Sequence, residues 1–301
     1  MFGCTNENSE VSYSIVSREE RLPDDIFKRE PATDQYPPVL HSNDYEKPIP
    51  LSIINTAGAE DSPFILPDGK TLYFFFTPDV RVSPEQQLFD GVTGVWVSYK
   101  EETWSNPQRV WLNKPEVLSL DGAVSIQKNN EMWFASAREG YEGMNIFTAE
   151  MVDEKWVNWE YAGDRLMKEI QIGEVHINDD DLYFHSSRSG GKGGYDIWVT
   201  TRNGDSWSDP LNIAVVNTDA MDGYPYVSSD GNELWFTRTY KGTPAIFRSV
   251  KKNDVWGEPE MIVSQFAGEP TLDNDGNLYF AHHYYEDGTM IEADIYVAYK
   301  K

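Results

Sequence analysis

Carboxylates recur at the start of five similar segments of this 301-residue chain, and their spacing makes them the first candidates for chemistry. The candidate acids are Glu60, Asp61, Asp121, Glu174, Asp222 and Glu269. Such side chains can cap a turn by accepting hydrogen bonds from backbone N–H groups, or they can bind a cation such as Ca²⁺. A pair of them can also act as general acid and general base. Residue type alone leaves all three uses open.

Two further residues belong to the same candidate site. His176 lies two positions after Glu174, so in an extended strand both side chains would lie on one face. Tyr224 occupies the position in its segment that Glu174 and Glu269 occupy in theirs. A histidine beside a carboxylate permits a metal site, but no His-Glu-x-x-His spacing supports one. We therefore include His176 and Tyr224 as ligand-binding candidates and assign no metal ligand.

The elements that must position these residues form a repeat. Each segment reads as a short apolar strand, a turn and a strand with a Leu- or Met-aromatic-Phe pattern. The five copies are SPFILPDGKTLYFFFT (62–77), AVSIQKNNEMWFASA (123–137), EVHINDDDLYFHSS (174–187), YPYVSSDGNELWFTRT (224–239) and EPTLDNDGNLYFAHH (269–283). A third, alternating strand follows each copy, and the repeat length of roughly 45–60 residues is that of four-stranded propeller blades.

A fourth segment completes most of the repeats. It opens with Trp and reaches Pro at 104–107, 207–210 and 256–259, whereas the second repeat has KWVNWEYAG (155–163). Because Trp104, Trp207 and Trp256 recur at one position of the repeat, we interpret them as packing between neighbouring sheets rather than as sugar-binding residues.

The last repeat lacks its fourth strand, since the chain stops at Lys301 directly after the third. The missing pattern occurs near the other terminus, where KPIPLSIINTAGAEDSP (47–63) matches SDPLNIAVVNTDAMDGYP (208–225). We therefore predict an all-β fold, a five-bladed β-propeller of four-stranded antiparallel blades whose N-terminal strand closes the last blade. Residues 1–35 are expected to form a tether and arm, and residues 36–301 the propeller.

The repeats resemble a known family. The strings SPFILPDGKTLYF, YPYVSSDGNELWF and SSRSGGKGGYDIW (186–198) are similar to the WD-like propeller repeat of the TolB type in bacterial envelope proteins. The resemblance implies a periplasmic or surface-anchored interaction protein. The Gly3-Cys4 step, followed by a polar stretch, resembles the acylated junction of bacterial lipoproteins, although the charged and apolar regions that should precede it are absent. Cys4 is therefore our candidate for lipid attachment.

The amino-acid composition limits the kinds of binding partner that this protein can have. There are 50 acidic and 25 basic residues, for a formal charge of −25, so the surface repels nucleic acid and anionic lipid. Membrane contact is expected only through a lipid on Cys4, and we expect a monomer without a cofactor, unless Ca²⁺ binds the carboxylates.

The first strand of each propeller blade lines the central channel, so the candidate acids should surround one mouth of it. We expect this mouth to bind a protein, glycan or peptide without catalysis. The alternative is a carboxylate-based glycoside hydrolase like the five-bladed arabinanases, with Asp61, Glu174 and Glu269 as its catalytic residues.

Overall fold

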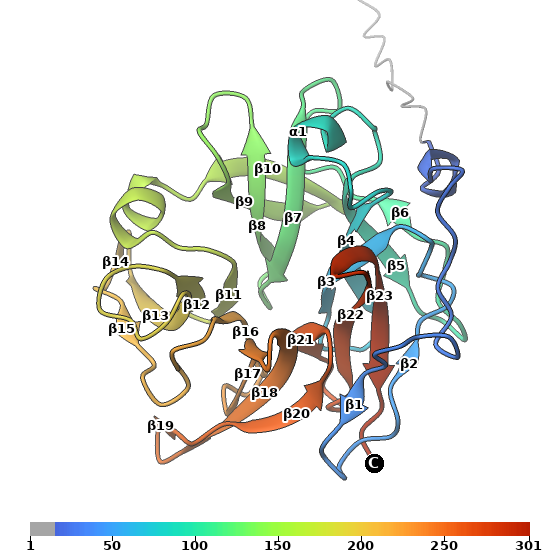
Figure 1. The fold of residues 1–301 in the computed structure, drawn as a ribbon. Helices are drawn as coiled ribbons and strands as arrows, with labels where there is room; N and C mark the ends of the chain where they lie inside the picture. Colours follow the sequence, from blue (N-terminus) through green and yellow to red (C-terminus); the bar gives the residue numbers. More distant parts are fainter. Residues whose placement is uncertain (1–15) are drawn as a thin grey trace, which may run out of the picture.

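A computed structural model describes residues 16–301, and Cys4 lies outside the described residues. In this part of the chain the strands form a ring of five antiparallel sheets, which we call blades one to five (Figure 1). Blades five and one are continuous through one parallel pairing, Ala293 with Ala59. The predicted all-β architecture is confirmed.

The blades contain the following elements. Blade one comprises β3 (Ala59–Ile65), β4 (Thr71–Thr77), β5 (Gly94–Tyr99) and β6 (Gln108–Arg109). Blade two comprises β7 (Ser119–Ile126), β8 (Glu131–Arg138), β9 (Asn145–Val152) and β10 (Lys155–Tyr161). Blade three comprises β11 (Val175–Asn178), β12 (Asp181–Ser186), β13 (Asp196–Asn203), β14 (Ser206–Trp207) and β15 (Leu211–Asn212). Blade four comprises β16 (Asp222–Val227), β17 (Glu233–Tyr240), β18 (Thr243–Lys252), β19 (Val255–Trp256) and β20 (Glu260–Ser264). Blade five comprises β21 (Ala267–Leu272), β22 (Leu278–Glu286) and β23 (Thr289–Ala298). The helical turns are η1 (Glu19–Arg21), α1 (Pro84–Gln87) and η2 (Arg165–Ile170).

The N-terminal segment closes the ring as predicted. Strand β2 (Ile49–Pro50) pairs antiparallel with β23, so it supplies the fourth strand of blade five. Asn55 then exchanges two hydrogen bonds with the backbone of Ile295, as Asn217 does with the backbone of Ile197 in blade three. The matching strings at 47–63 and 208–225 therefore perform the same structural task. An additional strand, β1 (Val39–Leu40), extends blade four by pairing with β20 and was not predicted.

Neighbouring blades are joined by one repeated aromatic contact. An aromatic ring of each outer segment meets, edge to face, an aromatic ring on the second strand of the preceding blade. The five pairs are Trp104–Tyr279, Trp156–Tyr73, Trp207–Trp133, Trp256–Tyr183 and Tyr45–Trp235, with centroids 5.8–6.4 Å apart. Packing between sheets is thus confirmed for the three recurring tryptophans. In blade five the aromatic ring is Tyr45, from the N-terminal segment.

The arm before the ring is docked onto it. Arg18 is 2% exposed and its guanidinium donates to Glu60 of β3 at 2.8 Å. Lys28 forms ion pairs with Glu292 and Asp294 of β23. Asp34 accepts from His282 of β22 at 2.8 Å. The segment that composition marks as an arm, as far as it is described, is therefore attached to blades one and five.

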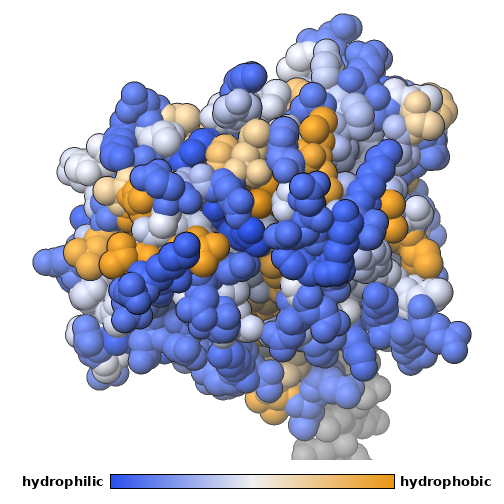
Figure 2. Space-filling model, turned by 90° about the horizontal axis from the view of Figure 1, so that it is seen from below, coloured by the Kyte–Doolittle hydropathy of each residue, from blue (hydrophilic) through white to orange (hydrophobic). Residues whose placement is uncertain are grey.

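The exterior agrees with the composition. The side of the ring that Figure 2 shows is largely covered by hydrophilic side chains, and the hydrophobic ones lie in separate groups. None of the helical turns in the described part of the chain has the length and apolar character needed to cross a bilayer.

Candidate functional site

A repeated bulge shapes the inner strands where they enter the channel. The register of the inner hairpin shifts at one place in blades one, two, four and five. The extra residue has φ between 45° and 57° and is Ser62, Ala123, Tyr224 or Glu269. These residues, with Glu174 of blade three, are the five positions that the sequence places in register. All five line one central cavity.

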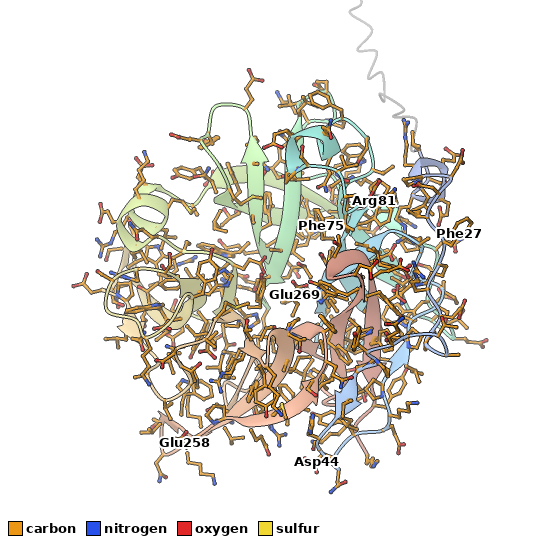
Figure 3. The ribbon with its side chains drawn as sticks, viewed as in Figure 1. Phe27, Asp44, Phe75, Arg81, Glu258 and Glu269 are labelled. Atoms are coloured by element: carbon orange, nitrogen blue, oxygen red, sulfur yellow. The ribbon has the colours of Figure 1, made fainter. Side chains whose placement is uncertain are left out.

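Three carboxylates from three blades meet in the channel. Asp61, Glu174 and Glu269 line a second cavity, which adjoins the first, from blades one, three and five, and each is half-buried. Asp61 and Ser62 are consecutive, and a regular strand would place them on opposite faces, so the bulge is what brings both into the cavity. Figure 3 shows Glu269 near the centre of the ring, far from Glu258 at its rim.

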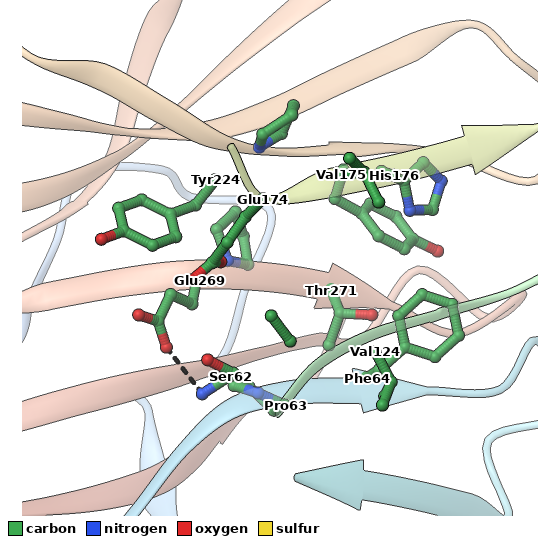
Figure 4. Close-up of a pocket in the computed structure, with 14 residues that line it drawn as sticks. Ser62, Pro63, Phe64, Val124, Glu174, Val175, His176, Tyr224, Glu269 and Thr271 are labelled. Atoms are coloured by element: carbon green, nitrogen blue, oxygen red, sulfur yellow. Dashed lines mark hydrogen bonds between the residues drawn. The ribbon is translucent and has the colours of Figure 1, made fainter. Parts of the chain in front are cut away.

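The surroundings of these carboxylates favour their protonated forms. Burial raises the pKa of Glu174, and the charges of Glu269 and Asp61 raise it further. Burial and the charge of Glu269 likewise raise the pKa of Asp61. Burial also raises the pKa of Glu269, although the Ser62 backbone N–H, which donates to its carboxylate at 2.6 Å, partly offsets this rise (Figure 4). Within residues 16–301 no donor forms a hydrogen bond to the Glu174 carboxylate.

The mouth of the channel combines this acidic floor with an apolar wall. The cavity there has a volume of about 440 Å³ and is lined on blades two and three by Leu120, Met144, Ile146 and Met167. No Lys or Arg is among its described lining residues. The wall was not predicted, because these residues read as ordinary strand and loop positions in the sequence.

Three of the predicted mouth residues lie elsewhere, and this corrects the sequence interpretation. Glu60, Asp121 and Asp222 are fully buried within or between blades and form ion pairs with arginines. Their partners are Arg18, Arg138 and Arg238, respectively. Thr56 and Thr218 also donate backbone and hydroxyl hydrogens to Glu60 and Asp222. These acids thus stabilise the start of the inner strands, the structural use that the sequence left open.

The predicted His176 and Tyr224 lie in different parts of the channel. Tyr224 is beside the carboxylates, and the charge of Glu174 together with burial raises the pKa of its hydroxyl. His176 packs against Tyr226 and Phe64 further along the channel, where burial lowers its pKa to about 4 (Figure 4). It is therefore a neutral ring in an aromatic constriction, separate from the acidic mouth.

A histidine outside the predicted set helps to shape the mouth. The His185 ring lies 3.4 Å from the backbone nitrogen of Glu174 and 3.2 Å from that of Tyr224. Burial lowers its pKa to about 4, so the ring is neutral and links blades three and four. Only its occurrence in the repeat, on the strand after Glu174, could have indicated this position. In residues 16–301 no group of three or more His, Cys, Asp or Glu side chains is arranged to hold a metal ion.

Comparison with known proteins gives the fold. No family model and no curated protein matches the chain. Among solved structures, an endo-arabinase from Bacteroides thetaiotaomicron VPI-5482 superposes with a TM-score of 0.52 at 16% identity, covering 84% of this chain and 96% of the other. Bacteroides ovatus Xyloglucan PUL GH43B gives 0.51 at 15% identity, covering 83% and 54%. TolB from Acinetobacter baumannii gives 0.44 at 11% identity, covering 83% and 56%.

The chain is a β-propeller. The likeness to the endo-arabinase and to GH43B is one of fold, and it agrees with the ring of five blades. What this propeller binds has to be argued from its own channel.

Proposed function

We propose that this propeller is an extracytoplasmic binding protein whose channel mouth takes a basic side chain of a peptide or protein partner. One observation carries the proposal: three carboxylates converge in a cavity that has no described basic lining residue. A Lys or Arg side chain entering the cavity would satisfy the three acids with charge-assisted hydrogen bonds.

The wall of the cavity suits the rest of such a side chain. Lys and Arg carry an apolar stem below the charged group, and the stem can pack along Leu120, Met144 and Met167. Methionine adapts its shape to different partners, so the mouth can accept either cation. The net charge of −25 would also speed the approach of a basic partner.

The location forms part of the same proposal. The repeat strings resemble the TolB type, whose relatives act in the periplasm or on the cell surface, and Cys4 has the context of a lipid-attachment site. Metabolic labelling with an alkyne fatty acid should mark the wild-type protein in its native host and should not mark Cys4→Ser. Equal labelling of both proteins, or of neither, would refute lipid attachment at Cys4. It would leave the proposed binding at the channel mouth unaffected.

Calorimetry with defined probes tests the mouth. The probes are N-acetyl-lysine amide, a short Lys/Arg-rich peptide, its acidic counterpart, a neutral arabino-oligosaccharide and CaCl₂. We expect the basic peptide to bind and Glu174→Gln to weaken it about tenfold or more. Glu258→Gln, which removes an exposed rim charge, should leave the affinity unchanged.

The other outcomes of this titration are decisive as well. If the basic peptide fails to bind at millimolar concentration, or binds Glu174→Gln equally well, the proposal is wrong. If Ca²⁺ binds and Asp61→Asn abolishes this binding, the ligand of the carboxylates is a metal ion and not a basic side chain.

A second function, glycoside hydrolysis, is favoured by one specific observation. The carboxyl group of Glu174 has a raised pKa and no described hydrogen-bond donor, as a general acid requires, and Asp61 and Glu269 face the same cavity. Aryl arabinosides and xylosides would report the activity through release of the phenol. Turnover by the wild type that Glu174→Gln and Asp61→Asn both abolish would establish the enzyme. If the wild type turns these substrates over no faster than Glu174→Gln does, hydrolysis at this site is excluded.

A further inference from the structure

A second pocket lies on the flank of the ring, between the outer strands of blades one and two. Its volume is about 860 Å³, within the range of ligand pockets. It is far richer in aromatic residues than the channel mouth. Its lining includes Tyr99, Trp111, Trp156 and Trp159. We call it the flank pocket.

The flank pocket occurs where blade two departs from the repeat. In every blade the aromatic residue of the outer segment has a cross-strand partner at the end of the third strand. The pairs are Lys100–Trp104, Met151–Trp156, Arg202–Trp207, Lys251–Trp256 and Lys300–Tyr45. In four blades this partner is a cation stacked on the ring, at 4.5–5.6 Å from its centroid. In blade two it is Met151, which lines the flank pocket.

A bulge in β10 adds a second tryptophan to the lining. Trp156 and Trp159 are three positions apart, so a regular strand would turn them to opposite faces. The register between β10 and β9 shifts between Val157 and Glu160, and Asn158 has a φ of 54°. The shift brings both indoles into one pocket, as bulges do where a side chain is redirected. Trp156 is then held against Tyr73, whereas Trp159 remains half-buried.

The polar groups of the pocket include both donors and acceptors. Gln108, Asn113 and Lys155 can donate, and Glu154 accepts. The indole nitrogen of Trp159 is buried and has no acceptor in residues 16–301. Because this nitrogen is screened from solvent, the polar groups that a ligand in the pocket would meet are those of Gln108, Asn113, Lys155 and Glu154.

We propose that the flank pocket is a carbohydrate-binding site for a short neutral oligosaccharide. The C–H face of a sugar ring packs on an aromatic ring, while its hydroxyl groups both donate and accept hydrogen bonds. A proline-rich peptide also packs on aromatic grooves, but its prolines have no N–H to give to Glu154. The mixture of donors and acceptors therefore favours the sugar. This site is independent of the channel mouth.

Fluorescence titration and calorimetry with arabino-, xylo-, cello- and manno-pentaose test the site. We expect at least one of them to bind and to change the tryptophan emission, and Trp159→Ala to weaken it about tenfold or more. Tyr240→Ala, which removes an exposed aromatic ring from blade four, should bind normally.

Met151→Lys gives a second test that does not depend on removing a packed aromatic residue. It restores the cation that covers the aromatic ring in the other four blades, so the protein should melt normally while the pocket is filled. We expect loss of sugar binding with Trp159 intact. Failure of all four sugars to bind the wild type overturns the proposal, as does undiminished binding by both variants. Binding of a proline-rich peptide in place of the sugars, with the same sensitivity to Trp159→Ala, would reassign the ligand.

Discussion

The ion pair between Arg18 of the arm and Glu60 of blade one should make stability depend on pH in a way that Arg18→Met exposes. Glu60 is 0% exposed, and burial raises the pKa of its carboxyl to about 7 even though Arg18 lowers it. The folded-state pKa thus exceeds the ordinary 4.5. The contribution of Glu60 to stability is therefore full below pH 4.5 and declines as the pH rises toward 7, by about 3 kcal/mol.

Removal of Arg18 should extend this decline to higher pH. Without the guanidinium the pKa of Glu60 rises further, so the variant continues to lose stability above pH 7 while the wild type does not. Breaking a buried pair on one side costs about 3–5 kcal/mol, or about 5–8 °C in Tm for a chain of this size. Methionine retains apolar contact with Phe74, Phe76 and Trp96, over which the guanidinium lies at 5.1–5.5 Å.

Thermal melts at pH 5, 6.5 and 8 at one ionic strength provide the measurement. The difference in Tm between wild type and Arg18→Met should be small at pH 5, where Glu60 is protonated in both, and largest at pH 8. Adding Glu60→Gln to both the wild type and Arg18→Met should make the difference in Tm between them independent of pH. Arg81→Met, which breaks the exposed pair with Asp25, is the control and should leave Tm unchanged (Figure 3). A difference in Tm that is the same at pH 5 and pH 8 would refute the reasoning, because only packing would then have been lost.

Three further predictions concern the closing segment, the arm and the channel mouth. Tyr45→Ala should destabilise the ring by about 3 kcal/mol, measured by denaturant unfolding, whereas Tyr45→Phe should retain most of the stability because the edge-to-face contact with Trp235 remains. Lys28→Met should loosen the arm increasingly above pH 7, since Glu292 has a pKa of about 7 even beside Lys28, and limited proteolysis within residues 16–35 should report this; cleavage at the wild-type rate would contradict it. Affinity for the basic peptide should rise with pH as the channel carboxylates, whose pKa values are raised, become ionised, and a constant affinity from pH 5 to pH 8 would oppose the proposed role of these groups.

The sequence was sufficient to predict the ring, because blade architecture is encoded locally. Strand alternation, Asp-Gly turns and the recurring Trp each depend on a few adjacent residues, and the match between 47–63 and 208–225 identified the closing strand. Even Tyr45 had a signal, since Tyr45-Glu-Lys-Pro48 has the spacing of Trp104-Ser-Asn-Pro107.

The positions of the candidate residues were predicted only in part. Asp61, Glu174 and Glu269 do line one cavity, but plain alternation from Ser62 would place Glu60 rather than Asp61 on the channel face, because it takes no account of the bulge after Asp61. The docked arm was also beyond local patterns. Arg18 and Lys28 read as solvated charges, and their partners lie 42 and more than 200 positions further along the chain.

The closing strand also determines the order in which this protein can be assembled. Asn55 bonds to Ile295, 240 positions later, so blade five stays incomplete until Ile295 has been synthesised. The earlier blades can form hairpin by hairpin during synthesis, while the segment around Ile49 waits without its partner. Pro48 and Pro50, which flank Ile49, limit the tendency of this largely apolar segment to pair with other strands in the meantime. The acidic mouth, which needs carboxylates of blades one, three and five together, therefore cannot form before blade five has been synthesised.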